Sequence, residues 1–234
     1  MTETATPTDP RDALLDAALP HVAFDGWTEA TFRAAAADAG IDPQAARAIC
    51  PRGALDLAVA FHKRGDDAMV ARLMREDLTA LRFRDRIAAA VRFRLEAAED
   101  REAVRRGSTL FALPQNAPEG ARLIWGTASR IWDALGDPSD DFNWYSKRAT
   151  LSGVYAATVL YWLGDETPGH QATWEFLDRR IDDVMQVEKV KGQVNANPVL
   201  KRLLAGPNWV LSQVKAPTRV PRVDLPGSWT PPRG

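Results

Sequence analysis

The segment between Asp141, which can cap a helix, and the break at Gly164 is apolar or aromatic on most sides of its predicted helix. Spacings of three and four residues mark one face of an α-helix, formed by Trp144, Arg148, Leu151, Tyr155, Thr158 and Trp162. The opposite side is also largely apolar, and a helix that faced only water would not tolerate this pattern. The helix is therefore expected either to lie at the centre of a bundle or to contact something outside the subunit.

Helical periodicity extends over much of the remaining chain. Residues 83–95, 101–113, 121–135 and 173–190 each predict a helix. Valine and isoleucine nowhere alternate with polar residues over a useful length, so no strand is predicted. The sequence therefore predicts an all-α protein in which residues 53–190 form one helical domain.

Residues 11–52 have the outline of a helix-turn-helix unit, with three short helices joined by tight turns. A first helix is predicted at 11–19, Gly40 ends the second helix, and Asp42 caps the third. The outline is typical of DNA binding, but residues 1–60 contain nine acidic and four basic side chains. Non-specific DNA affinity comes from Lys and Arg contacts to phosphates. We therefore predict no nucleic-acid partner, and a transcriptional regulator with a small-molecule pocket is the alternative.

Residues 197–215 form an apolar segment with basic residues at its margins. Its candidate membrane contacts are Leu200, Leu203, Leu204, Trp209 and Leu211. A short amphipathic helix of this composition can lie in a membrane interface. The pattern is equally compatible with a final helix that covers the bundle core. Residues 1–10 are polar and predicted to be disordered, and residues 216–234 form a proline-rich tail.

Composition places the chain among ordinary globular proteins and offers no catalytic motif. Of its 234 residues, 45% are hydrophobic and 26% are charged, and the formal net charge is -1. No apolar run approaches the roughly 18 residues of a transmembrane helix. The three histidines are far apart and belong to no metal-binding motif, and no phosphate-binding loop or nucleophile motif occurs. We predict a protein that is not an enzyme and that needs no metal or cofactor.

Three stretches of the chain resemble the ubiquinone-biosynthesis accessory proteins of the Coq-nine type. They are ALPHVAFDGWTEATFRAAAADAG near the start, GDPSDDFNWYSKRATLSGVY in the middle and TWEFLDRRIDDVM further along. The resemblance covers roughly Leu14 to Val187, and the middle motif is the most specific of the three. After about Val190 the chain resembles the family only in its general character, and no specific motif of the family is matched there. Cys50 stands where the family usually has an aromatic residue before the proline.

The resemblance implies the helical fold of tetracycline-repressor-like (TetR-like) regulators, with residues 53–190 as a lipid-binding domain that forms a homodimer. Such proteins bind isoprenoid quinone intermediates or phospholipid and assist the di-iron hydroxylase that acts on demethoxyubiquinone. A C-terminal amphipathic helix meets the membrane. The implied location is peripheral, on the cytoplasmic side of a bacterial inner membrane or the matrix side in mitochondria. The implied hydroxylase-binding residues are Trp144, Tyr145, Arg148, Leu151, Asp137 and Asn143.

The physical demands of such a ligand agree with the implied role. A polyprenyl quinone is too apolar to leave a bilayer unaided, since each buried CH₂ contributes about 0.8 kcal/mol. An apolar cavity between helices can replace the lipid. Candidate wall residues are Phe83, Ile87, Val91, Leu95, Ile124, Tyr155 and Trp162. The same residues are compatible with a filled core, because protein interiors are normally close-packed.

Overall fold

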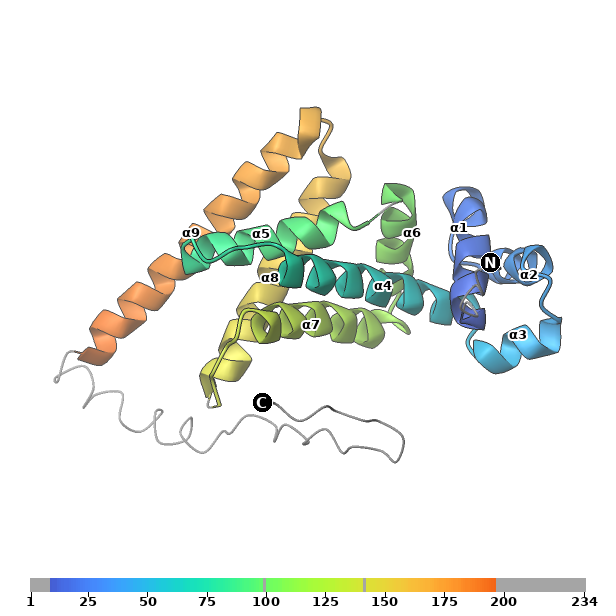
Figure 1. The fold of residues 1–234 in the computed structure, drawn as a ribbon, viewed down its shortest axis with the longest axis horizontal. Coiled ribbons are helices and arrows are strands. Elements are labelled where there is room, and N and C mark those ends of the chain that lie inside the picture. The colour runs from blue at the N-terminus through green and yellow to red at the C-terminus, as the bar shows by residue number, and fades with distance from the viewer. Residues whose placement is uncertain (1–8, 99, 141, 197–234) are drawn as a thin grey trace, which may run out of the picture.

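A computed structural model describes residues 9–98, 100–140 and 142–196, and every regular element within them is helical (Figure 1). The all-α prediction is therefore confirmed. The helices are α1 (Pro10–Asp25), α2 (Glu29–Asp38), α3 (Pro43–Ile49), α4 (Ala54–Arg75), α5 (Phe83–Glu96), α6 (Arg101–Ala112), α7 (Ala117–Ala134), α8 (Phe142–Gly164), the short 3-10 helix η1 (Pro168–His170) and α9 (Gln171–Ala196).

The first helix is longer than the sequence predicted. It continues through Pro20 to Asp25, so the predicted end near Leu19 is wrong. Proline has no N–H to donate and disfavours a helix interior. Pro20 is exposed, while Ala18 and Val22 on either side are buried in the N-terminal core. Packing of the buried face therefore outweighs the local cost of the proline.

Capping residues set the starts of the next two helices, as the sequence predicted for α3. The Thr28 hydroxyl accepts a hydrogen bond from the Thr31 backbone N–H at 3.3 Å, at the start of α2. The Asp42 carboxylate accepts a hydrogen bond from the Gln44 backbone N–H at 2.9 Å, at the start of α3. Gly53 precedes α4 with a positive φ of 62°, a conformation that favours glycine.

Two clusters of buried apolar side chains form the core, and α4 belongs to both. It contributes Leu57 and Ala58 to a cluster with α1, α2, α3 and α6, and Met69 and Leu73 to a cluster with α5, α7, α8 and α9. Figure 1 shows α4 running from the N-terminal helices into the larger bundle. The junction of the two clusters therefore lies along α4.

The described helices do not include one with both the length and the apolar content needed to cross a bilayer. The predicted membrane contacts Leu200, Leu203, Leu204, Trp209 and Leu211 lie outside the described residues.

Candidate functional site

A cavity of about 390 Å³ lies where the two core clusters meet, bordered by α4, the end of α5, α6, α7 and α8. Apolar and aromatic side chains form most of its wall, among them Trp27, Phe61, Leu95, Phe111, Ile124 and Val159. The volume lies within the range of about 300–1,000 Å³ that is typical of small-molecule sites. The cavity is therefore large enough to hold an organic ligand or part of one.

The exposed lining residues indicate that the cavity opens between the end of α6, the start of α7 and α8. The lining residues Ala112, Ala117 and Ala121 are exposed, and the lining residue Leu160 is exposed to 66%. A leucine that is exposed to this extent presents apolar surface to solvent at the entrance. The rim of the cavity is therefore apolar on at least these three sides.

One part of the wall is polar, and five connected residues at and behind it, His62, Asp66, Arg94, Thr127 and Tyr155, are here called the polar cluster. Arg94 donates hydrogen bonds from Nε to Asp66 Oδ1 at 2.6 Å and from Nη2 to the His62 carbonyl at 3.0 Å. The Thr127 Oγ1 lies 2.9 Å from His62 Nε2 and donates to Asp66 Oδ1 at 2.9 Å. Tyr155 is within hydrogen-bonding reach of the Thr127 hydroxyl. His62, Arg94 and Tyr155 line the cavity directly.

Burial sets the protonation states in the polar cluster. Desolvation, and then the charge of Arg94, lower the pKa of His62 to about 4, so its ring is neutral at pH 7. Burial raises the pKa of the Tyr155 phenol, which therefore stays protonated. The Arg94 charge is balanced by Asp66, with which it forms a buried ion pair. The polar cluster thus presents hydrogen-bonding groups without a net charge.

Three residues predicted as cavity walls from the apolar stripes line this cavity. They are Leu95 of α5, Ile124 of α7 and Tyr155 of α8. Each lies on the part of its helix that approaches the junction along α4.

Four other predicted wall residues lie elsewhere. Ile87, Val91 and Trp162 are buried in the larger core cluster and do not line the cavity. Phe83 is 42% exposed and packs against Trp132, with ring centroids 5.6 Å apart. For Ile87, Val91 and Trp162 the structure favours the filled core that the periodicity left open. Phe83 belongs neither to the cavity wall nor to the core cluster.

The sequence did not lead to a prediction of the polar cluster, although one feature of the sequence, a charged residue within an apolar run, could have indicated it. Arg94 lies among Val91, Phe93 and Leu95, all of which are buried. A charge in such a run needs a buried partner, because an unpaired buried charge is very costly. The partner, Asp66, is 28 positions earlier in the chain and on another helix. Pattern analysis of either helix alone does not bring the two together.

A second candidate site lies at the start of α8, where aromatic side chains meet. The rings of Trp144 and Tyr145 are 4.8 Å apart, and the rings of Trp144 and Trp125 of α7 are 6.0 Å apart, between centroids. All three side chains are partly exposed. We refer to Trp125, Trp144 and Tyr145 as the aromatic cluster.

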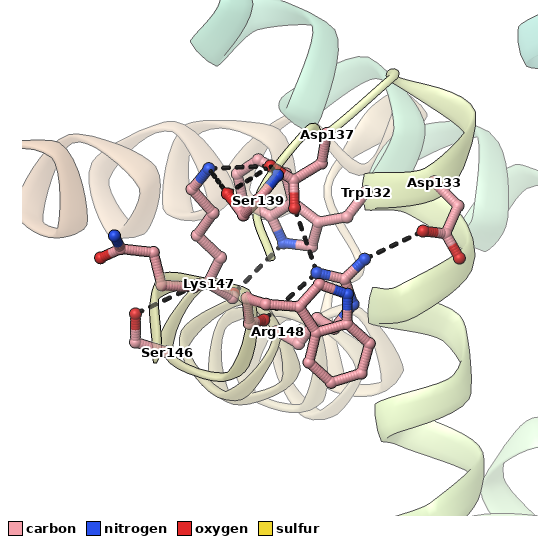
Figure 2. A network of polar contacts seen from close by, with 9 residues as sticks. Trp132, Asp133, Asp137, Ser139, Ser146, Lys147 and Arg148 are labelled. Atoms are coloured by element: carbon pink, nitrogen blue, oxygen red, sulfur yellow. Dashed lines mark hydrogen bonds and ion pairs between the residues drawn. The ribbon is translucent and has the colours of Figure 1, made fainter. Parts of the chain in front are cut away.

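A polar network holds the loop between α7 and α8 against the start of α8 (Figure 2). Lys147 donates from Nζ to Asp137 Oδ1 at 2.8 Å and to Ser139 Oγ at 2.6 Å. Arg148 donates from Nη1 to Asp137 Oδ2 at 3.1 Å and from Nη2 to Asp133 Oδ1 at 2.9 Å. The two basic residues of the NWYSKR motif therefore clamp both oxygens of one carboxylate.

This network determines the charge of Asp137 and connects it to the aromatic cluster. Burial alone would raise the pKa of Asp137, but hydrogen bonds from Lys147, Ser139 and Arg148 outweigh it and lower the pKa to about 2. The Arg148 guanidinium also lies over the Trp144 ring, 4.0 Å from its centroid. The buried Arg148 thus contacts both Asp137 in the loop and the partly exposed Trp144 ring.

The residues predicted to bind a partner fall into two groups. Arg148, Leu151 and Asp137 are buried, so their side chains have almost no surface to offer a partner in this structure. The other members of the set, Trp144, Tyr145 and Asn143, reach the surface. The predicted set therefore consists of three surface residues, of Arg148 and Asp137, which form the network beneath Trp144, and of Leu151, which belongs to the larger core cluster.

Within the described part of the chain, no three histidine, cysteine or acidic side chains are grouped as a metal site would require.

Comparisons with known proteins identify relatives of this chain. Residues 117–188, which cover α7, α8 and most of α9, match the COQ9 family model. The protein "Ubiquinone biosynthesis protein COQ9, mitochondrial" of Drosophila melanogaster is 32% identical over 188 residues, which are 78% of this chain and 57% of that protein. A protein of Dictyostelium discoideum, named "Probable ubiquinone biosynthesis protein coq9, mitochondrial", is 27% identical over 192 residues, or 77% of this chain and 61% of that protein. The chain thus spans about three fifths of the length of these two curated relatives.

A solved structure with a similar fold is the crystal structure of the TetR transcriptional regulator from Nitrosomonas europaea ATCC 19718. The TM-score is 0.62, with 21% sequence identity over 74% of this chain and 97% of that chain. A likeness at this identity concerns the fold alone, and it confirms the TetR-like architecture.

Proposed function

The chain belongs to the COQ9 family, and on this premise we propose that it is a non-catalytic lipid-binding accessory protein of ubiquinone biosynthesis. In this proposal it binds an isoprenoid quinone intermediate and presents it to the demethoxyubiquinone hydroxylase at the membrane. The observation that carries the proposal is the cavity of about 390 Å³, with its largely apolar wall and its apolar mouth. Each prenyl CH₂ buried there is stabilised by about 0.8 kcal/mol relative to water.

The size of the cavity limits how much of such a ligand is enclosed. A CH₂ group is about as large as a water molecule, which occupies roughly 30 Å³, so a volume of 390 Å³ holds roughly a dozen non-hydrogen atoms. This corresponds to one substituted ring or about two isoprene units. The rest of a long chain extends through the mouth. The size therefore supports presentation of a ligand whose chain stays in an apolar environment, in preference to complete extraction from the membrane.

The aromatic cluster is the proposed docking surface for the hydroxylase. Partly exposed Trp and Tyr side chains are enriched among the residues that carry binding energy in protein interfaces. Trp144 lies on the buried Arg148, which is itself held by Asp137, so its ring is positioned before a partner arrives. A preorganised side chain loses less conformational entropy on binding.

Membrane attachment and self-association complete the proposal. We assign attachment to residues 197–215, on the basis of their apolar sequence with basic margins. The protein would act as a homodimer, peripheral to the membrane in which the quinone is made. The relatives named above carry the word "mitochondrial" in their names.

The alternative is a transcriptional regulator, which the TetR-like fold favours. The charges oppose it, because Arg47, the basic residue of α3, forms an ion pair with Glu29 and lies over the Phe32 ring. A regulator must bind DNA with a steep dependence on salt concentration. A gel-shift titration at low salt that gave salt-sensitive DNA binding would support the regulator over the accessory protein.

Lipid binding is tested on the purified full chain by native mass spectrometry, followed by extraction and identification of any bound lipid. We expect an isoprenoid quinone or another prenyl lipid in the extract and co-sedimentation of the protein with liposomes. A protein that carries no lipid, takes up none from quinone-containing liposomes and does not bind them would contradict the proposal.

Docking is tested by measuring hydroxylase binding to a Trp144→Ala variant. We expect at least a tenfold weaker affinity, as for an aromatic residue central to an interface, with unchanged helix content. Trp174→Ala is the matched control, because Trp174 lies in the first turns of α9, beyond the opposite end of α8. Equal affinities of the two variants for the hydroxylase would show that the aromatic cluster is not the docking surface.

A further inference from the structure

The buried part of the cavity wall carries Arg94 and Tyr155 beside apolar side chains such as Leu95, whereas the exposed lining residues are alanines and Leu160. Arg94 and Tyr155 are 5% and 4% exposed, whereas Leu160 at the rim is 66% exposed. A site that takes a lipid tail first has the reverse arrangement, with an apolar end and a polar entrance that faces water. The distribution of polarity therefore favours a ligand whose polar part enters first.

The buried end of the cavity offers donors for an oxygen atom of the ligand. A guanidinium carries five N–H groups, and the hydrogen bonds described for Arg94 run to Asp66 and to the His62 carbonyl. The Tyr155 hydroxyl and the His62 ring line the same cavity. Carbonyl and hydroxyl oxygens of a ring can accept hydrogen bonds from these groups.

The charge of the polar cluster indicates the class of head group. Asp66 neutralises Arg94 at a distance of 2.6 Å, and both side chains are almost completely buried. A phosphate would bring one or two negative charges beside the Asp66 carboxylate with no excess positive charge to balance them, which is costly at low dielectric. A neutral oxygen-bearing ring needs only the hydrogen bonds. The cluster therefore fits a quinone or phenol better than a phospholipid head.

We infer that the cavity binds its ligand head first: the polar cluster receives the neutral ring of a quinone or phenol, and the prenyl chain leaves through the mouth at Leu160. This inference rests on the proposed function and deepens it by assigning an orientation. The hydrogen-bonding residues are Tyr155 and Arg94, and His62 shapes the ring pocket. A chain that leaves through an apolar mouth can remain in the membrane while the ring is held by the protein. In this orientation the ring must leave the polar cluster through the mouth before the hydroxylase can act on it.

The first test compares two ligands by calorimetric titration of the full-length protein. One is a ubiquinone with two isoprene units, and the other is a hydrocarbon of the same two isoprene units without a ring. Tyr155→Phe removes one hydroxyl and leaves the ring, so we expect the quinone to bind about five- to tenfold more weakly, as for one lost hydrogen bond. The hydrocarbon should bind unchanged. Tyr161→Phe is the matched control, because Tyr161 is 40% exposed and does not line the cavity.

The outcomes separate this inference from the proposed function. Absence of quinone binding to the wild-type protein would overturn both. Tight quinone binding that Tyr155→Phe leaves unchanged, or that falls in parallel with hydrocarbon binding, would overturn the orientation alone.

A second test uses only the wild-type protein. Two quinone probes carry a photoreactive diazirine, one on the ring and the other at the end of the two-unit chain, and cross-linked peptides are identified by mass spectrometry. We expect the ring probe to label peptides with His62 or Arg94 and the chain probe to label peptides with Ala112, Ala121 or Leu160. The reversed pattern, or one pattern for both probes, would refute head-first binding.

Discussion

The clamp on Asp137 makes a quantitative prediction for the change Asp137→Asn. The substitution keeps the shape of the side chain and removes its charge, so Arg148 is left buried with weaker partners. The pKa of Asp137 is about 2 in the folded protein and 3.8 for the free side chain. At about 1.4 kcal/mol per pKa unit, this difference corresponds to roughly 2.5 kcal/mol of stability. We expect Asp137→Asn to lose about 2–3 kcal/mol at pH 7.

The pH dependence of this effect follows from the direction of the shift. The folded pKa of Asp137 lies below the unfolded one, so the stabilisation is fully present above about pH 4 and is lost as the pH falls towards 2. At pH 3 roughly half of it remains. The difference in stability between wild type and Asp137→Asn should therefore shrink by about half between pH 7 and pH 3.

The assay is urea unfolding followed by tryptophan fluorescence at both pH values. A loss of 2–3 kcal/mol lowers the midpoint at pH 7 by about 1 M, for a slope of about 2–3 kcal/mol per M. Asp140→Asn is the matched control, because Asp140 lies in the same loop and is exposed, and its midpoint should stay within about 0.3 M of the wild type. If Asp137→Asn unfolds within 0.5 kcal/mol of the wild type at pH 7, the argument from the buried clamp is refuted.

Two further predictions concern the polar cluster. Gly65→Ala should destabilise the protein by about 2 kcal/mol or more in the same urea assay, because a Cβ would lie 2.5 Å from Nη1 of the buried Arg94. Gly126→Ala is the control: a Cβ on this α7 residue would meet no atom within 4 Å, so the substitution should stabilise the protein by about 0.5–1 kcal/mol. Because the folded pKa of His62 is lowered to about 4 from 6.5, its contribution is present above pH 6.5 and declines as the pH falls towards 4. Wild type should therefore lose more stability between pH 7 and pH 5 than His62→Gln, and equal losses would contradict the neutral buried ring.

Local patterns along the chain predicted the helices well, because a helix depends on residues three and four positions apart. Asp42 and its first-turn neighbours were sufficient to predict the start of α3. The extension of α1 through Pro20 was not predicted, because it depends on packing against other helices. The sequence shows the helix-breaking effect of Pro20, but it does not show how much stabilisation the burial of neighbouring side chains provides against that effect.

The candidate sites were predicted only in part, for the same reason. The NWYSKR motif indicated the start of α8, but the stripe that includes Trp144 and Arg148 does not distinguish an exposed ring from a buried guanidinium. Arg148 is buried because Asp133 and Asp137, on the preceding helix and loop, compensate its charge. Leu95 and Val91 share one stripe, yet one lines the cavity and the other is in the filled core.

The amino-acid sequence by itself determined the helical class, the start of α3 and the family resemblance, since these depend on composition and on residues that are close along the chain. Only the tertiary structure decided where the cavity lies and that its buried end is polar. Asp66, Arg94 and Thr127 come from three helices, with 28 positions between the first two and 61 between Asp66 and Thr127. Groups so far apart in sequence come into contact only when α4, α5 and α7 pack together, and the periodicity of a single helix cannot predict which residues of other helices it will contact.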